Sequence, residues 1–267
     1  MKGEIVTLTE ENLGEHRAFC GLSGRYLEGH AKKIEWLIAR WKEGLRYKLY
    51  KVDGKNAGFI EYIPGDYAWR GVDAKGYLFI HCFWVLGKQK RHGYGQQLLE
   101  ACLRDAHAYH GVAVVTSKTH WLPTQKIFLK NGFELADQAP PSYDLLVKRF
   151  SPDAPMPRFN RNWQNDYDFP RGLTFFKSDQ CPYMYVMDDS ILQIGEELSI
   201  PVDIVRLETA REAQNSPCVY GVMGLFYNGE LLTYHPMGKE KILELLEYRM
   251  IGQTNHLEKS TGGIGSN

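Results

Sequence analysis

Hydrophobic and polar residues follow two periods along the chain, and each change of period marks a predicted element. In the first half, alternating or short apolar runs predict strands over residues 2–9, 46–52, 57–63, 76–87, 112–116 and 142–150. Apolar residues at helical spacing predict helices over residues 11–20, 27–43, 96–110 and 121–129. This order of strands and helices indicates an α/β domain with a mixed sheet over residues 1–150.

The second half repeats the mixture on a smaller scale. A proline-rich segment predicts a linker over residues 151–171. The residues beyond it predict a strand, helix, strand, helix, hairpin and helix, an order typical of a thioredoxin-like layer. This second α/β domain covers residues 172–251, and the polar, glycine-rich residues 252–267 are expected to form a disordered tail.

Charge and cysteine content exclude several function classes. The 267 residues contain 32 basic and 32 acidic residues, so no global field attracts nucleic acid or an anionic membrane. No apolar run is long enough for a membrane span and the N-terminus has no signal core, so a cytoplasmic protein is expected. The five cysteines are scattered without zinc spacing, and we expect reduced thiols and no metal.

The most informative stretch is the apolar run over residues 76–87, which leads through a basic loop directly into the helix from residue 96. Gly93 and Gly95 lack a Cβ where a ligand would touch backbone, and Lys90 and Arg91 add positive charge. Free N–H groups at a helix start bind anions. The loop therefore predicts a phosphate site, although a solvated basic hairpin explains a lone pair of glycines equally simply.

Two motifs connect this stretch to a known family. The residues KRHGYG at 90–95, between a strand and a helix, and IFLKNGF at 127–133 resemble the acceptor loop and the closing motif of the GNAT family of acyl-CoA-dependent N-acyltransferases. The resemblance covers residues 1–150 and implies acetyl-CoA as co-substrate. Lys90 stands where the family prefers Arg or Gln, which keeps the charge but loses a bidentate contact.

The resemblance also assigns roles. It implies that the pantetheine arm pairs with Val85, Leu86 and Gly87, and that the N–H of Val85 polarises the thioester carbonyl. The residues it implies at the pyrophosphate are Lys90, Arg91, His92, Gly93, Tyr94, Gly95 and Gln96. Phe128 also falls in the coenzyme site, where many members have the tyrosine that protonates the departing thiolate. The role of general acid is then vacant or filled from elsewhere.

An attacking amine must be neutral, because an ammonium has no lone pair. A base with a pKa near neutral would help to remove its proton. On the central strand, His81 and Cys82 precede the coenzyme-pairing residues, and strand alternation predicts that only one faces the acceptor. His81 is the better base by its usual pKa, and Glu61 on the neighbouring strand is the second candidate. Each residue also has a purely structural explanation: His81 can be a hydrogen-bonded strand histidine, and Glu61 can be a solvated carboxylate on an edge strand.

In the second domain, Cys181 directly follows a predicted strand and precedes a predicted helix, a position that can lower a thiol pKa. Met184 stands where a CxxC pair would have its second cysteine. Together with the first domain, SDQCPY and LFYNGELLTY resemble bacterial GNAT proteins that carry a C-terminal YoaP-like domain.

The leading hypothesis is an N-acetyltransferase that moves an acetyl group from acetyl-CoA to an amine of a small molecule or peptide. The alternative is a thiol-redox or thiol-sensing protein that uses Cys181, with the GNAT domain as an acyl-CoA-binding module. Either function is compatible with a homodimer.

Overall fold

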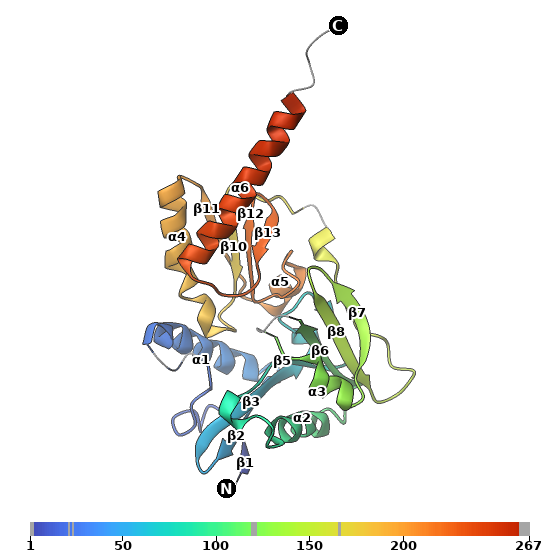
Figure 1. Ribbon diagram of the computed structural model, residues 1–267. Helices are drawn as coiled ribbons and strands as arrows, with labels where there is room; N and C mark the ends of the chain where they lie inside the picture. Colours follow the sequence, from blue (N-terminus) through green and yellow to red (C-terminus); the bar gives the residue numbers. More distant parts are fainter. Residues whose placement is uncertain (1–2, 21, 23, 119–121, 165–166, 262–267) are drawn as a thin grey trace.

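The computed structural model describes residues 3–20, 22, 24–118, 122–164 and 167–261, and it holds two main sheets (Figure 1). The first is a seven-stranded sheet in the order β1-β2-β3-β5-β6-β8-β7. Its strands are β1 (Gly3–Thr7), β2 (Arg46–Val52), β3 (Lys55–Pro64), β5 (Leu78–Val85), β6 (Gly111–Ser117), β7 (Glu134–Ala139) and β8 (Tyr143–Arg149). Neighbouring strands are antiparallel except β5 and β6, which are parallel. The predicted mixed α/β sheet is confirmed, and β7 is a strand that the sequence pattern missed.

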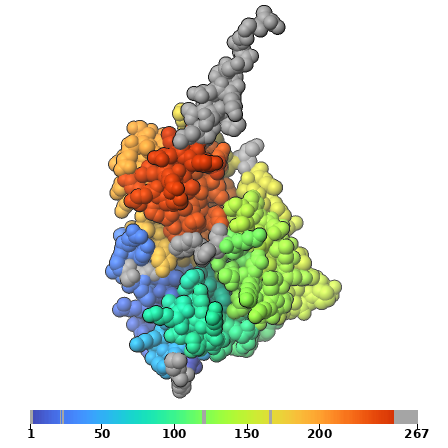
Figure 2. Space-filling view, viewed as in Figure 1, coloured from blue at the N-terminus to red at the C-terminus, as the bar shows by residue number. Residues whose placement is uncertain are grey.

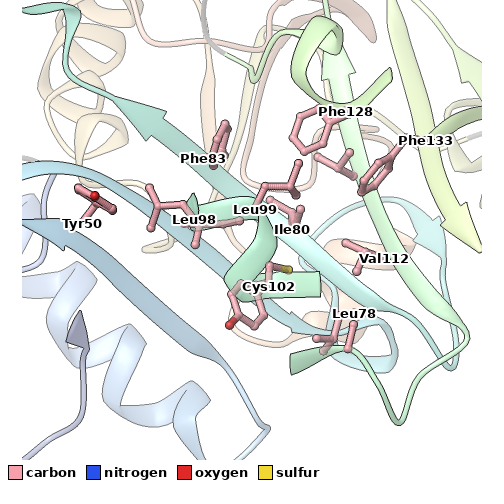
Figure 3. Close-up of a cluster of buried hydrophobic side chains, with 14 of the residues drawn as sticks. Tyr50, Leu78, Ile80, Phe83, Leu98, Leu99, Cys102, Val112, Phe128 and Phe133 are labelled. Carbon is pink, nitrogen blue, oxygen red and sulfur yellow. The ribbon is translucent and has the colours of Figure 1, made fainter. Parts of the chain in front are cut away.

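Helices cover both faces of this sheet. On one face, α2 (Tyr94–Asp105) and α3 (Gln125–Lys130) bury Leu98, Leu99 and Phe128 against β3, β5 and β6 (Figure 3). On the other face, α1 (Leu27–Trp41) buries Trp36 and Leu37 against β2 and β3. The helices predicted over 27–43, 96–110 and 121–129 are thus confirmed, although the last begins later than predicted.

The hairpin of β2 and β3 turns at Asp53 and Gly54, both with positive φ (47° and 78°). Such turns match the twist of the strands they join, as the sequence predicted. The helix predicted over residues 11–20 is wrong, because the structure has turns there. The Asn12 side chain donates to the carbonyl of Thr7 and accepts the N–H of Thr9, both at 2.9 Å, and such local bonds compete with helix formation.

A β-bulge interrupts β5 at His81. Glu61 of β3 lies opposite Cys82, and Tyr62 lies opposite Ile80, so His81 is an extra residue without a partner. The pairing of β5 with β6 also ends here, at Ile80 and Val114, although both strands continue. Beyond the bulge the two strands are no longer paired, and a gap opens in the middle of the sheet.

The second sheet has the order β11-β10-β12-β13. Its elements are β10 (Leu173–Lys177), α4 (Met187–Leu198), β11 (Val202–Arg206), α5 (Ala210–Asn215), β12 (Met223–Tyr227), β13 (Glu230–Thr233) and α6 (Lys239–Thr261). β10 and β11 are parallel and the other pairs are antiparallel. The predicted order of strands and helices is confirmed, and the thioredoxin-like relationship stays a prediction.

The predicted linker needs correction. Within residues 151–171, Phe159 is buried against the first sheet, and β9 (Arg158–Phe159) pairs with β4 (Val72–Asp73). This segment is therefore part of the packed structure. The backbone of α6 runs to Thr261, and the disorder expected from residue 252 stays a prediction; residues 262–267 lie outside the described residues.

The second domain packs directly on the face of the first sheet that carries α1. In Figure 2 its orange and red surface lies against the blue N-terminal and green β6–β8 parts. Phe176 and Phe226 share a hydrophobic cluster with Trp36 and Phe59, and the N–H of Gly71 donates to the carbonyl of Val219 at 3.1 Å. The two domains thus share one apolar core.

A buried charge cluster crosses this interface. The Lys33 ammonium lies 2.5 Å from one carboxylate oxygen of Glu61, and the Gln180 amide donates to the other at 2.8 Å. Lys33 comes from α1, Glu61 from β3, and Gln180 from the loop after β10. Both charged side chains are almost fully buried, so each depends on the other to offset its desolvation.

Of the described residues, no helix combines the length and apolar character needed to cross a bilayer.

Replacing one partner of this pair tests its contribution. Lys33→Met leaves the Glu61 carboxylate buried without its cation, so we expect the free energy of unfolding to fall by about 3–5 kcal/mol in urea titrations. Lys241→Met breaks the exposed pair with Glu244 and should cost under about 0.5 kcal/mol. Equal losses in the two variants would show that the buried pair has no special role.

Candidate functional site

The gap between β5 and β6 opens into a groove of about 750 Å³ on the molecular surface. Phe83, Trp84 and Val85 of β5 form one wall, and Ser117 and Lys118 at the end of β6 form the other. The start of α2 closes one end. The groove therefore depends on the bulge, because the bulge ends the pairing that would fill it.

Backbone geometry points one donor of β5 into this gap. Leu86 donates its N–H to the carbonyl of Ala57 on β3 at 2.9 Å. Since N–H groups alternate sides along a strand, the N–H of Val85 points away from β3 and toward the gap. Val85 also lines the groove. This is the geometry that a donor to a bound carbonyl oxygen needs.

The two glycines of the basic loop have different physical roles. Gly93 caps α2 with φ of 79°, and a Cβ there would meet nothing within 4 Å. Glycine is thus required for the backbone conformation at that position. A Cβ on Gly95 would lie 3.1 Å from the Phe83 ring and 3.3 Å from Ile127, so Gly95 lets α2 approach the sheet and α3. Packing thus requires glycine at residue 95, and its contact with a ligand stays a prediction.

Many of the predicted coenzyme residues line this groove, namely Val85, Lys90, Arg91, Gly93, Tyr94, Gly95 and Gln96. Leu86 and His92 lie next to lining residues along the chain and Gly87 lies two residues from Val85, but none of the three lines the groove. The His92 ring instead stacks on Tyr94 with centroids 5.5 Å apart.

Sequence reasoning missed the far wall of the groove. Ser117, Lys118 and Gln125 line it, and Lys118 adds a cation opposite the basic loop. The available signal was weak: polar residues that directly follow a fully buried strand. Their importance follows only from the separation of β5 and β6.

Phe128 belongs to the core. It is fully buried, and its ring centroid lies 5.8 Å from that of Phe83 and 5.2 Å from that of Phe133 (Figure 3). It is absent from the groove lining. Its assignment to the coenzyme site is therefore a prediction that the structure contradicts, because α3 turns this ring inward.

His81 is not placed to act as a base. Its Nε2 accepts the N–H of Trp69 at 2.9 Å, so the ring proton sits on Nδ1, 3.3 Å from Glu61. Burial lowers the pKa of His81 to about 4, although Glu61 partly opposes this. With its lone pair already used and its side chain fully enclosed, His81 has no site at which to take a proton from an amine.

Glu61 is excluded for a related reason. Burial opposes its ionisation, but the charge of Lys33 and the neighbouring His81 ring lower the pKa of Glu61 to about 2. A carboxylate this acidic, 1% exposed and held by Lys33 and Gln180, is a structural anion. The catalytic assignment of His81 and Glu61 is thus corrected: Glu61 bonds across the domain interface to Gln180, and His81 is a buried structural group beside it.

His81 and Cys82 line the same small cavity of about 40 Å³, together with Glu61. Strand alternation predicts that only one of them faces the acceptor; neither lines the groove, and both can line this cavity because the bulge breaks the strict alternation of side chains. The His81 carbonyl, freed from the strand ladder, accepts a bond of 2.8 Å from the buried guanidinium of Arg70.

Cys181 lines the same cavity, as do Cys20 and Cys82. Burial raises the pKa of the Cys181 thiol, and burial raises the pKa of Cys82 to about 12. Cys181 precedes a three-residue 3-10 turn, Pro182–Met184, and α4 begins only at Met187. The predicted low-pKa thiol is therefore wrong, since the partly buried Cys181 thiol is desolvated and does not lie at an α-helix start. No cluster of His, Cys, Asp or Glu suited to a metal occurs among the described residues.

Comparison with known proteins agrees with this geometry. The profile of the Acetyltransferase (GNAT) family matches residues 15–133, and the YoaP-like profile matches residues 201–244. Over 247 residues, the chain is 30% identical to a Bacillus subtilis protein described as the uncharacterized N-acetyltransferase YoaP. That alignment covers 90% of this chain and 97% of the relative.

Among solved structures, the PaiA N-acetyltransferase from Thermoplasma acidophilum, in complex with coenzyme A, is 15% identical with a TM-score of 0.42. The alignment covers 56% of this chain and 100% of that one. A GNAT family acetyltransferase from Brucella melitensis in complex with acetyl-CoA is 19% identical with a TM-score of 0.38, covering 58% of this chain and 92% of that one.

The two profiles fall on the two halves of the chain, and the Bacillus subtilis relative spans both. The first profile includes the central strand, the basic loop and α2, which together form the groove. The chain therefore belongs to the GNAT family of acetyltransferases, in the form that carries a YoaP-like domain at its C-terminal end.

Proposed function

We propose that this acetyltransferase uses acetyl-CoA and transfers the acetyl group to an amine of a small molecule or peptide. The observation that carries the proposal is the groove between β5 and β6, which joins a strand edge with a free N–H to a cationic helix start. An extended thioester with a phosphate at its far end matches both features.

The residues present fit each part of the coenzyme. The first N–H groups of α2 have no partner within the helix, whose first bond runs from Gln97 to Gly93, so they can donate to the pyrophosphate. Lys90, Arg91 and Lys118 line the groove and add positive charge. The free edge of β5 can pair with the amide groups of the pantetheine arm, as a further strand would.

The chemistry then needs little beyond positioning and charge stabilisation. The amine nitrogen donates its lone pair to the thioester carbon, and the carbonyl oxygen gains negative charge near the Val85 N–H. The C–S bond breaks as the C–N bond forms, the sulfur leaves as a thiolate, and the nitrogen loses its proton to solvent. The described lining of the groove contains no carboxylate or imidazole, so we assign no side-chain base.

Acetyl-CoA binding tests the phosphate site. Gly93→Glu places a carboxylate at the α2 start, so we expect acetyl-CoA binding, measured by calorimetry, to weaken at least about 100-fold. Gly54→Glu is the matched control, because Gly54 has a similar φ of 78° and equal open space, but lies in the β2–β3 turn. Equal affinities in wild type and both variants would contradict the proposed site.

The role of His81 can be tested with two readouts. Its folded pKa of about 4 lies below the usual value of about 6.5, so the folded state binds fewer protons between these values. Its contribution to stability is therefore complete above pH about 6.5 and is lost as the pH falls toward 4. We expect the His81→Asn variant to give a flatter plot of unfolding free energy against pH in this window. Replacing the exposed His107, as His107→Asn, should leave that slope as in wild type.

Turnover should separate this structural role from catalysis. Per folded molecule, His81→Asn should change acetyl transfer by less than about twofold, whereas loss of a general base costs roughly 100-fold or more. A loss of that size with unchanged acetyl-CoA affinity would restore His81 to the mechanism.

A further inference from the structure

A second cavity, of about 570 Å³, lies between the two domains. Tyr143 at the start of β8 and Trp163 line it from one side, and Tyr220 and Tyr234 line it from the YoaP-like domain. A cavity of this size with mostly apolar walls is typical of a small-molecule site. Because both domains contribute rings, it exists only in the two-domain protein.

The aromatic walls are arranged around one buried hydroxyl. The Tyr143 ring stacks on Tyr220 with centroids 6.3 Å apart, and its centroid lies 4.9 Å from that of Tyr234. Tyr143 is 2% exposed, and its Oη finds no hydrogen-bond partner among the described residues. A buried hydroxyl without a partner is costly, and a polar group of a ligand in this cavity would satisfy it.

This cavity lies next to the coenzyme groove. Tyr143 is the strand partner of Ser117, which lines the groove, so the two sites are separated by one pair of neighbouring strands. Hydrogen bonds also connect them: Ser117 Oγ lies 2.9 Å from Ser142 Oγ, which lies 3.5 Å from Tyr234 Oη. A ligand in the aromatic cavity is therefore within reach of the open end of the groove.

We propose that this aromatic cavity is the acceptor site and that it takes an arylalkylamine, a primary amine carried on an aromatic ring. This proposal rests on the acetyltransferase function proposed above. The aromatic ring of the acceptor would stack on the tyrosines of the cavity, and the acceptor's amine would extend toward the open end of the groove. The second domain thereby selects the acceptor.

Charges around the cavity favour a single amine over a polyamine. The Arg70 guanidinium lies 4.5 Å from the Tyr220 ring centroid, and that of Arg161 lies 5.4 Å from the Trp163 centroid. Each of these two rings thus already has a guanidinium over it, and this disfavours a second positive charge of a ligand nearby. Arg249 is paired with Glu230 at 2.7 Å, so this pair adds no net charge to the cavity.

Binding and turnover of phenylethylamine by the full-length protein test the proposal. We expect phenylethylamine to bind in saturation-transfer NMR without acetyl-CoA, and to be acetylated with a lower KM than hexylamine or spermidine. Tyr234→Leu should raise the KM for phenylethylamine at least about tenfold, the effect of losing one aromatic contact. Tyr143→Phe, which deletes only the buried hydroxyl, should raise the KM for tyramine more than that for phenylethylamine.

Tyr248→Ala is the control, because Tyr248 is 78% exposed on α6 and does not line the cavity. It should leave every KM unchanged. If phenylethylamine binds no better than hexylamine, or if Tyr234→Leu and Tyr248→Ala behave alike, the proposal is overturned.

Acetyl-CoA calorimetry on the same samples separates this proposal from the proposed function. Acetyl-CoA binding with acetylation of hexylamine, unaffected by Tyr234→Leu, would overturn the arylalkylamine site and leave the acetyltransferase function standing. Absence of acetyl-CoA binding, even with phenylethylamine bound in the NMR experiment, would overturn both.

Discussion

The bulge at His81 is the constraint on which the rest of the structure depends. One extra residue in β5 ends its pairing with β6 at Ile80, and the gap that follows becomes the coenzyme groove. The same residue leaves a carbonyl outside the strand ladder, and this carbonyl is satisfied by the buried Arg70. A buried cation in turn needs surrounding partners, so the bulge affects both the groove and the interior beneath the second domain.

The second domain supplies part of what the buried charges need. Gln180 donates to Glu61 and lies within 3.5 Å of Arg70, so one loop of the second domain contacts two buried charges of the first. Without that loop, the cluster would face solvent or remain incompletely bonded. The YoaP-like domain thus completes the fold of the acetyltransferase sheet, and this explains why the two domains share one hydrophobic cluster.

Local rules were sufficient for most elements and for the near wall of the site. The Asp53-Gly54 turn, the stripe of α1 and the step from β5 through the Gly93 loop into α2 each depend on residues close together in sequence. Periodicity failed where a distant contact or a specific side-chain hydrogen bond decided the outcome. β7 lacks a clear alternating pattern and forms because β8 lies beside it. Residues 11–20 form turns and no helix, because the Asn12 side chain bonds to the nearby backbone.

The sequence by itself determined the two-domain α/β organisation, the basic loop at a helix start and the family resemblance, because these depend on periodicity and on short motifs. Only the tertiary structure decided that Phe128 lies in the core, that Glu61 bonds across the domain interface, and that His81 is buried beside it. It also decided that Cys181 lies partly buried in a small cavity and that two domains enclose an aromatic cavity. The physical reason is that burial, pKa and hydrogen-bond partners are properties of the assembled neighbourhood. In that neighbourhood, Glu61 meets Gln180 across 119 residues of chain.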